Sequence, residues 1–341
     1  MEVITFDLDD TLWPTTPVVM AANQAFVDFC QERIPGFPDC AGVNEYMKVI
    51  VRAARAPNLT FRARHPDHPF SAPPAVTNSS SSPPPRRPPV RRRSPDHQSR
   101  PPTSQAIRKE REERSVKLGE RHVPLSFAAL RIAGGFRAAV ELGVPEPDAV
   151  GIVSRGYHIA WIPTRGVAAR EHLFDGVVAM LEQLRRQHPN ACIGTITNGL
   201  GSAAGAGLGD FFDFEISADA MMDEMMVHGD DARKPAAFPF ELAGKMAREM
   251  RDYKGDPNAW VHVGDDLVND CEAAKTHGPF RTVLVEHPGV VPYQPGGGGT
   301  SYPGDPEREE EGMDRSRLVD ARVTSVGEIP GAIADIYAKR G

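Results

Sequence analysis

The sequence predicts an α/β fold in which a doubly wound parallel sheet carries an inserted helical cap. From Leu173 onward, short apolar runs of strand length alternate with segments of helical periodicity, an order typical of parallel strands joined by crossover helices. A further apolar run, Val3 to Phe6, opens the chain and supplies a first strand far from the others. Most of the intervening chain has helical periodicity, so we expect a helical subdomain over the sheet.

The predicted elements follow in chain order. Before Leu173, amphipathic spacing predicts helices over Val18–Arg33, Leu125–Leu142 and Asp148–Trp161. Beyond it, the predicted elements are a helix around Val177–Leu184, strands Cys192–Thr197 and Phe212–Ser217, a helix over Phe238–Met250, strand Trp260–Val263, a helix over Asn269–His277 and strand Thr282–Val285.

The core domain is predicted to comprise residues 1–13 and 171–341, and the cap residues 14–170. Segment 57–114 interrupts the cap with SSSSPPPRRPPVRRRSP and holds 12 Lys and Arg against 5 Asp and Glu. Too few apolar residues are present to offset its chain entropy, so we expect it to be a disordered linker; a nuclear-localisation or RNA-binding patch is the alternative. Pro292–Asp314, with GGGG and an acidic run, is expected to be a surface loop.

The composition is that of a soluble globular protein, with 40% hydrophobic and 25% charged residues among 341. The 4 cysteines lack CxxC spacing and indicate neither a zinc site nor a disulfide framework. Met1 leads directly into a strand, and no apolar run reaches the ~18 residues of a membrane span. We therefore expect a cytoplasmic protein with no membrane partner. The net charge of -7 argues against nucleic acid as the main partner, and the oligomeric state stays open.

Polar side chains follow three of the predicted strands, where ligands bind in open α/β sheets. The residues that follow these strands are Asp7, Asp9, Thr197, Asn198, Asp265 and Asp266. Lys234 lies just before the helix that precedes strand Trp260–Val263, and Asp270 lies in the helix that follows this strand. Several carboxylates at such short distances repel one another unless a cation compensates their negative charge. Carboxylate oxygens are ligands that Mg²⁺ prefers, usually together with substrate phosphate oxygens. The sequence therefore predicts a Mg²⁺ site that can also hold a phosphate group.

Four motifs in order resemble those of the haloacid dehalogenase (HAD)-like hydrolase superfamily. DLDDT at Asp7 is similar to the first motif, Thr197 in ITNG to the second, Lys234 in RKP to the third, and GDDLVND from Gly264 to the fourth. The resemblance covers the chain outside its two loose segments and implies a Rossmann-like core. The opening FDLDDTLWP is also similar to plant and algal members of this superfamily.

The resemblance implies a role for each motif residue. Asp7 is expected to be the nucleophile that forms an aspartyl-phosphate, and Asp9 the general acid and then base. The metal ligands implied are Asp7, Asp265 and the main-chain carbonyl of Asp9, with Asp270 acting through water. Thr197, Asn198 and Lys234 are implied to bind the substrate phosphate, with Thr197 and Lys234 also catalytic.

The implied activity is Mg²⁺-dependent hydrolysis of small phosphate monoesters, with a small phosphorylated metabolite as partner. Dehalogenases lack an acid at the position of Asp9 because a halide leaves without a proton. Only 36 residues separate Thr197 from Lys234, too few for a large α/β cap, whereas 189 separate Asp7 from Thr197. The resemblance therefore implies a helical cap of the first type. A catalytically idle HAD-like binding or regulatory protein is the alternative.

Some residues have simpler interpretations. Asp10 is expected to bond the backbone of a turn, only one of Asp265 and Asp266 to meet the metal, and His262 to serve in packing. GLGSAAG from Gly199 imitates a dinucleotide fingerprint, but its spacing is GxGxxxG and an oxidoreductase would leave the acidic residues unexplained. A receiver domain would need neither the acid at Asp9 nor a cap.

Overall fold

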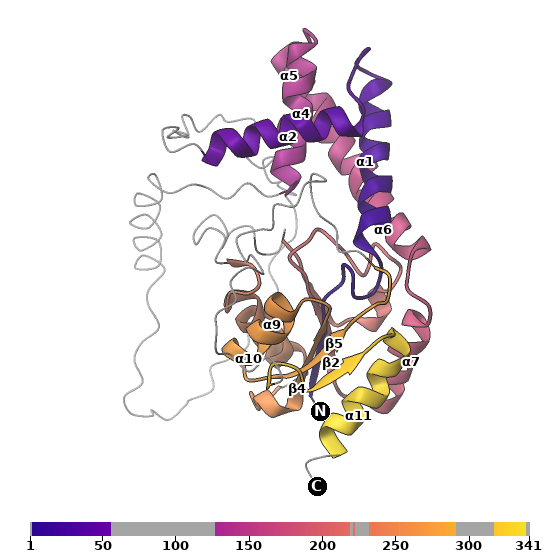
Figure 1. Ribbon diagram of the computed structural model, residues 1–341, viewed down its shortest axis with the longest axis vertical. Helices are drawn as coiled ribbons and strands as arrows, with labels where there is room; N and C mark the ends of the chain where they lie inside the picture. The colour runs from indigo at the N-terminus through magenta and orange to yellow at the C-terminus, as the bar shows by residue number, and fades with distance from the viewer. Residues whose placement is uncertain are drawn as a thin grey trace, which may run out of the picture. The chain divides into compact units, whose positions relative to one another are not determined.

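The computed structural model describes residues 2–55, 127–218, 221, 232–251, 253–290 and 317–338. In this part of the chain, parallel strands form one six-stranded sheet in the order β3-β2-β1-β4-β5-β6 (Figure 1). The strands are β1 Val3–Phe6, β2 Cys192–Ile196, β3 Phe214–Ile216, β4 Trp260–Gly264, β5 Arg281–Val285 and β6 Ala321–Val323. The predicted doubly wound parallel sheet is confirmed. The basic insertion 57–114 and the loop Pro292–Asp314 lie outside the described residues.

The first strand lies near the centre of the sheet. Val3 pairs with Cys192 of β2 on one side and with Trp260 of β4 on the other. All four residues of β1 are buried, as expected for a strand that is covered on both faces. The carboxyl ends of β1, β2 and β4 therefore meet at one edge of the sheet.

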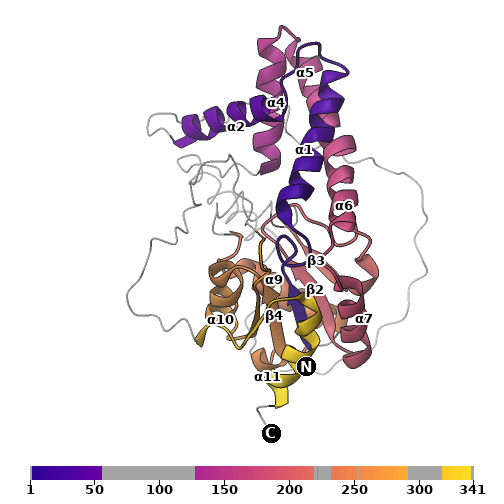
Figure 2. The same ribbon diagram turned by 45° about the vertical axis from the view of Figure 1, so that its right-hand side comes forward.

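Helices cover both faces of the sheet (Figures 1 and 2). On one face, α7 Val177–Gln187 and α11 Ile329–Ala338 pack with Ile4 and Phe6 into one buried cluster. On the other face, α9 Phe238–Arg251 and α10 Ala273–His277 pack with Val3 into a second cluster. The alternation of β1 side chains between the two clusters follows from the two-residue period of a strand. Among the described helices, none is long and apolar enough to cross a membrane.

A separate set of helices lies between β1 and α7 in the sequence. They are α1 Thr15–Gln31, α2 Cys40–Arg55, α4 Phe127–Glu141, α5 Glu146–Gly156, the π-helical turn η1 Tyr157–Trp161 and α6 Ile162–Glu171. Apolar side chains of α1, α2, α4, α5 and η1 form a third buried cluster, whereas Ala168 and Ala169 of α6 pack in the sheet cluster that contains Ile4 and Phe6. This is the helical subdomain expected from the sequence. Its assignment as a cap with bounds at residues 14 and 170 stays a prediction.

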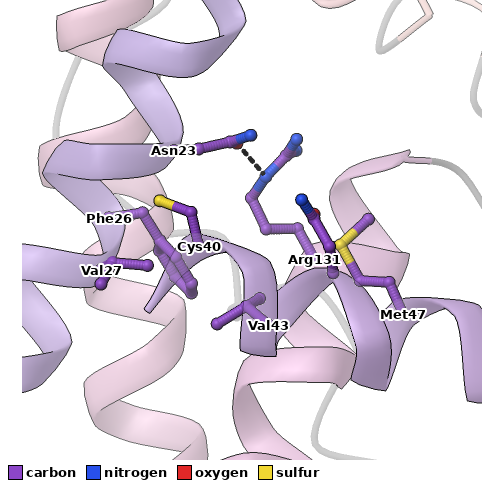
Figure 3. A pocket seen from close by; sticks show the side chains of 8 residues that line it. Asn23, Phe26, Val27, Cys40, Val43, Met47 and Arg131 are labelled. Atoms are coloured by element: carbon purple, nitrogen blue, oxygen red, sulfur yellow. Dashed lines mark hydrogen bonds between the residues drawn. The ribbon is translucent and has the colours of Figure 1, made fainter. Parts of the chain in front are cut away.

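A polar contact organises the interior of the helical subdomain. The side-chain oxygen of Asn23 accepts hydrogen bonds from Arg131 Nε at 3.0 Å and from Trp161 Nε1 at 2.9 Å. Figure 3 shows Asn23 and Arg131 meeting beside a cavity of about 10 Å³ that is also lined by Phe26 and Met47. A cavity of this size holds one water molecule at most.

Two glycines bring the helical subdomain against the core. A Cβ on Gly166 of α6 would lie 2.8 Å from the carbonyl oxygen of Gly205, in the loop after β2. Backbone cannot move aside as a flexible side chain can, so a side chain at Gly166 would push α6 away from this loop. The glycine-rich loop that imitates a dinucleotide fingerprint thus serves close approach between two backbones.

One aspartate links both helical layers to the sheet. Asp213 accepts hydrogen bonds from Arg185 Nη2 of α7 at 3.0 Å, from Arg251 Nη2 of α9 at 2.6 Å and from the Ile193 amide of β2 at 2.9 Å. Burial opposes ionisation of Asp213, but these donors more than offset it and hold the pKa of its carboxyl below the usual 3.8.

We expect Asp213→Asn to lower the free energy of unfolding at pH 7 by about 2 kcal/mol, since hydrogen bonds to charged groups contribute roughly 1.5–3 kcal/mol. A lowered pKa in the folded state stabilises the fold above pH 3.8, and this stabilisation is lost as the pH falls through the folded-state value. Urea unfolding at pH 7 and pH 3 should therefore show a smaller difference between variant and wild type at pH 3. The exposed neighbour Asp210, changed to Asn, is the control; equal effects of the two substitutions would contradict the prediction.

Candidate active site

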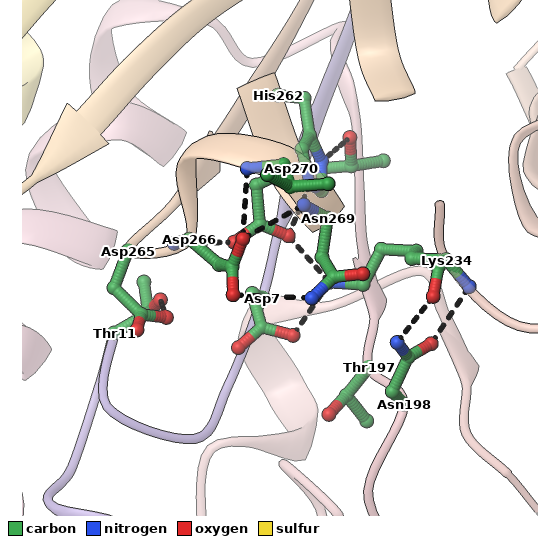
Figure 4. A network of polar contacts seen from close by, with 12 residues as sticks. Asp7, Thr11, Thr197, Asn198, Lys234, His262, Asp265, Asp266, Asn269 and Asp270 are labelled. Carbon is green, nitrogen blue, oxygen red and sulfur yellow. Dashed lines mark hydrogen bonds and ion pairs between the residues drawn. The ribbon is translucent and has the colours of Figure 1, made fainter. Parts of the chain in front are cut away.

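Three carboxylates converge at the carboxyl edge of the sheet (Figure 4). Asp7 follows β1, Asp265 follows β4, and Asp270 lies in the π-helical turn η5, Leu267–Glu272. One carboxylate oxygen from each residue lies within 4.8 Å of the others. Single π-helical turns occur often at functional sites. The sequence predicted a cluster of five acids, and the structure brings three of them together; Asp9 and Asp266 lie outside the cluster.

Lys234 joins two of these carboxylates. Its Nζ atom donates to Asp7 Oδ1 at 2.7 Å and to Asp270 Oδ1 at 2.5 Å, and its side chain is buried. Asn198 fixes the lysine backbone: its Oδ1 accepts from the Lys234 amide at 2.8 Å, and its Nδ2 donates to the Lys234 carbonyl at 2.7 Å. The Asn198 side chain therefore positions Lys234, a role that the sequence did not indicate.

The pKa values of the three carboxyl groups are shifted in different directions. Burial, and more weakly the charges on Asp270 and Asp9, raise the pKa of Asp7 to about 8 despite the adjacent Lys234. Burial and the charges on Asp7 and Asp270 raise the pKa of Asp265 well above its usual value. Burial also opposes ionisation of Asp270, but Lys234 and His262 outweigh it and lower its pKa. The protein alone thus supplies too little positive charge for all three carboxylates.

For Lys234, the neighbouring carboxylates outweigh the effect of burial on the pKa. Burial disfavours its ammonium form, but Asp270 and Asp7 overcome this effect and raise its pKa above the usual value. The lysine is therefore charged at neutral pH and can offset one of the carboxylates. A second positive charge is still needed at this site.

The residues present fit a divalent cation. The donor set consists of carboxylate oxygens, which suit Mg²⁺. Asp265 Oδ1 accepts from Thr11 Oγ1 at 2.9 Å, while its Oδ2 has no hydrogen-bond donor among the described residues. Asp270 is more occupied: Lys234 and His262 donate to Oδ1, and the Asp266 amide donates to Oδ2. This difference favours direct coordination by Asp265 over direct coordination by Asp270.

A buried chain of hydrogen bonds supports Asp270 from inside the sheet. His262 Nε2 lies 3.2 Å from Asp270 Oδ1, and His262 Nδ1 lies 2.9 Å from Thr5 Oγ1. Trp260 Nε1 in turn donates to Thr5 Oγ1 at 2.8 Å. His262 is buried as expected, but the packing interpretation was incomplete, because the ring also holds the acidic partner of Lys234.

The neighbouring acids bond the backbone. Asp266 Oδ1 accepts from the amides of Val268 and Asn269, both at 2.8 Å, and so caps η5. Asp10 has a positive φ of 58° and accepts from the Thr15 amide at 2.8 Å. The predicted turn-bonding role of Asp10 is confirmed, and Asp265 rather than Asp266 belongs to the carboxylate cluster.

The Asp9 side chain points to a different set of partners. Both of its oxygens lie 2.7 Å from Arg165 Nη2 of α6, and Oδ1 also accepts from Trp13 Nε1 at 2.9 Å. Asp9 is therefore absent from the carboxylate cluster, so only its main-chain carbonyl remains a candidate metal ligand. Arg165 couples this acid to the helical subdomain.

Thr197 follows β2, and its hydroxyl group donates no hydrogen bond to any residue that the structure describes. Its amide donates to the Ile216 carbonyl at 2.9 Å, so this N–H is not available to a phosphate in this conformation. Its Oγ1 accepts from the Gly199 amide at 3.1 Å, which leaves the hydroxyl hydrogen to donate elsewhere. A Cβ on Gly199 would lie 2.4 Å from Asp9 Oδ2, so this glycine admits the acid beside Thr197.

Comparison with known proteins decides the family. A family model described as haloacid dehalogenase-like hydrolase matches residues 1–278. The chain belongs to this family. As a haloacid dehalogenase-like hydrolase it is an enzyme of the hydrolase class, in agreement with the resemblance of its four motifs. A search of curated proteins gives no match.

Among solved structures, a dehalogenase shares the fold of this hydrolase. The 2-haloacid dehalogenase from Pseudomonas syringae pv. tomato DC3000 is 20% identical, with a TM-score of 0.55 over 98% of this chain and 99% of that chain. The magnesium-bound HAD-hydrolase YfnB from Bacillus subtilis is 13% identical, with a TM-score of 0.43 over 97% of each chain. A HAD phosphatase from Thermococcus onnurineus is 15% identical, with a TM-score of 0.39 over 98% of each. At 20% identity, the likeness to the dehalogenase shows the fold alone.

Proposed function

We propose that this haloacid dehalogenase-like hydrolase is a Mg²⁺-dependent phosphatase of small phosphate monoesters. The observation that carries the proposal is the presence of a second acid, Asp9, two residues after Asp7 and beside Thr197. A halide leaves as a stable anion, whereas an alkoxide needs a proton from a positioned acid. Phosphate ester hydrolysis thus uses a group that dehalogenation would not need.

The chain's own residues supply the nucleophile and the acid and base of a two-step reaction. The Asp7 carboxylate attacks phosphorus, the bond from phosphorus to the ester oxygen breaks, and Asp9 gives its proton to the departing alkoxide. Asp9 then takes a proton from water, which attacks the aspartyl-phosphate and releases inorganic phosphate with Asp7 restored. Lys234 and the Thr197 hydroxyl hold the phosphoryl oxygens during both steps.

The metal would be held by Asp7, Asp265 and the main-chain carbonyl of Asp9, with Asp270 reaching it through water. When bound, Mg²⁺ supplies the missing positive charge that keeps Asp7 ionised and offsets the charge of the phosphoryl group. Lys234 keeps its hydrogen bonds to Asp7 and Asp270 and fixes the direction of the nucleophile.

One observation favours the alternative of a catalytically idle binding protein. Arg165 donates to both oxygens of Asp9, so the acid is engaged by the protein in this conformation. A working enzyme must let Asp9 exchange a proton with the ester oxygen. Turnover measurements separate the two functions.

The direct test is release of inorganic phosphate by the purified full chain from a panel of sugar phosphates, nucleotides and phosphorylated carboxylic acids. We expect Mg²⁺-dependent turnover of at least one small ester and its loss when EDTA removes the metal. A 2-haloacid in the same assay tests dehalogenation. Turnover of the haloacid alone, or of no compound, would refute the proposal.

Metal binding can be measured apart from activity. We expect Mg²⁺ to raise the melting temperature of the wild type, because a ligand that binds only the folded state stabilises it. Asp265→Asn should abolish this shift, and Asp175→Asn, an exposed control, should retain it. A full Mg²⁺ shift in Asp265→Asn would show that the cation is held elsewhere.

A further inference from the structure

His287 follows β5 at the carboxyl edge of the sheet and belongs to none of the four motifs. Its Nε2 atom lies 3.1 Å from the main-chain oxygen of Thr11, in the turn after β1. A carbonyl oxygen only accepts, so Nε2 carries a proton and donates it. Since β4 lies between β5 and β1, this hydrogen bond passes across the end of the strand that Asp265 follows.

Thr11 continues this contact to the carboxylate cluster. The residue is completely buried, and a buried main-chain carbonyl needs a donor, which His287 supplies. The hydroxyl of the same threonine donates to Asp265 Oδ1 at 2.9 Å, beside the cluster in Figure 4. Two hydrogen bonds in series therefore connect His287 with Asp265.

An aromatic neighbour fixes the imidazole of His287. The ring centres of His287 and Phe174 lie 3.6 Å apart, and the ring planes are inclined by 23°. The Phe174 amide donates to the Leu12 carbonyl at 3.0 Å, so the phenyl ring is attached to the same turn as Thr11. A donor that is already held in position loses little conformational entropy when it binds its acceptor.

The direction of the Asp265 carboxylate depends on this arrangement. The Thr11 hydroxyl occupies Oδ1, which leaves Oδ2 for a cation. Hydrogen bonds from residues outside the metal shell orient metal ligands in this way, and their loss typically lowers metal affinity by roughly 10–100-fold. A shift of Thr11 would remove the contact that orients Asp265.

We propose that His287 is a positioning residue for the cation: by holding the Thr11 carbonyl, it keeps the Thr11 hydroxyl on Asp265 and directs this carboxylate toward Mg²⁺. The inference rests on the proposed Mg²⁺ site and adds to it a residue that contacts neither the cation nor the substrate. Its effect is on metal affinity, which is measured without turnover.

The test is titration calorimetry of the purified full chain with MgCl2 in the absence of substrate. His287→Phe keeps an aromatic ring beside Phe174 but has no N–H donor, so we expect the Kd for Mg²⁺ to rise at least about 10-fold. His287→Gln retains a donor and should bind Mg²⁺ more tightly than His287→Met, which has a side chain of similar length without one. His172→Asn, at an exposed position two residues before Phe174, should bind Mg²⁺ as the wild type does.

A double-mutant cycle tests the route through Thr11. Thr11→Val removes the hydroxyl and keeps the shape of the side chain, so it should also raise the Kd about 10-fold. If the two residues act in series, His287→Phe should have almost no further effect in the Thr11→Val background. An equal loss of Mg²⁺ affinity in both backgrounds would refute the positioning role. Should His287→Phe fail to fold, equal Kd values for His287→Gln and His287→Met would refute it as well.

Binding and turnover separate this inference from the phosphatase proposal. Coupled losses of Mg²⁺ affinity without turnover of any ester would refute the phosphatase and leave the role of His287 standing. Wild-type Mg²⁺ affinity in a folded His287→Phe protein would refute this role alone. Absence of Mg²⁺ binding by the wild type would refute both.

Discussion

Asp7→Asn should reduce kcat for phosphate ester hydrolysis by at least about 10³-fold, because an amide cannot attack phosphorus and the covalent route is lost. In the wild type, acid quenching during turnover should trap phosphate bound to the protein. The variant should trap none. Phosphate release and acid-stable protein-bound phosphate, measured on the same samples, check the two parts of this prediction.

The loss of activity in Asp7→Asn identifies the nucleophile only if the variant is correctly folded. Burial and neighbouring charges raise the pKa of Asp7 to about 8, so its neutral replacement should leave the melting temperature of the metal-free protein unchanged or higher. Asp175→Asn, on the exposed surface, controls for loss of a carboxylate in general. A well-folded Asp7→Asn protein with wild-type turnover would exclude Asp7 as the nucleophile.

Lys234→Met should both inactivate the enzyme and destabilise it. The ammonium lies between Asp7 and Asp270, and its removal leaves buried carboxylates without their positive partner. Breaking a buried ion pair from one side typically costs about 3–5 kcal/mol. We expect a loss of this size in the free energy of unfolding of the metal-free protein, measured in urea, and at most a small change for Lys245→Met at an exposed position of α9.

A double variant distinguishes charge from packing as the cause. In Lys234→Met/Asp270→Asn the unpaired charge on Asp270 is also removed, so a large part of the lost stability should return, while activity should not. If the double variant is as unstable as the sum of the two single variants, the lysine acts through its packing and the electrostatic account of this site is wrong.

The sheet and the acidic cluster could be predicted because both follow from short-range patterns. Parallel strands end at one edge, so the residues that follow them meet there without knowledge of the rest of the chain. This argument placed Asp7 and Asp265 together, as the structure does, but it also placed Asp9 there, whose side chain pairs with Arg165 instead. The apolar periodicity of the sequence did not predict α2, which borders the basic insertion, or the last two elements, β6 and α11.

Contacts between distant elements could not be predicted in this way. Arg165 lies on α6, which begins after the end of the predicted helix Asp148–Trp161 and was not predicted as an element, and no local signal relates Arg165 to Asp9. The same holds for the pairing of Asn198 with the Lys234 backbone and for the contact of His262 with Asp270. These contacts depend on how the helices and loops come together in three dimensions, which a period of apolar residues does not encode.

The position of β1 has a consequence for how the chain folds. Val3 is synthesised well before its two strand partners, which begin at Cys192 and Trp260. The centre of the sheet therefore cannot close during synthesis until most of the chain has emerged, and pairings this distant in sequence slow folding. We expect refolding of the full chain to be slow, with the apolar residues of β1 exposed to chaperones in the meantime.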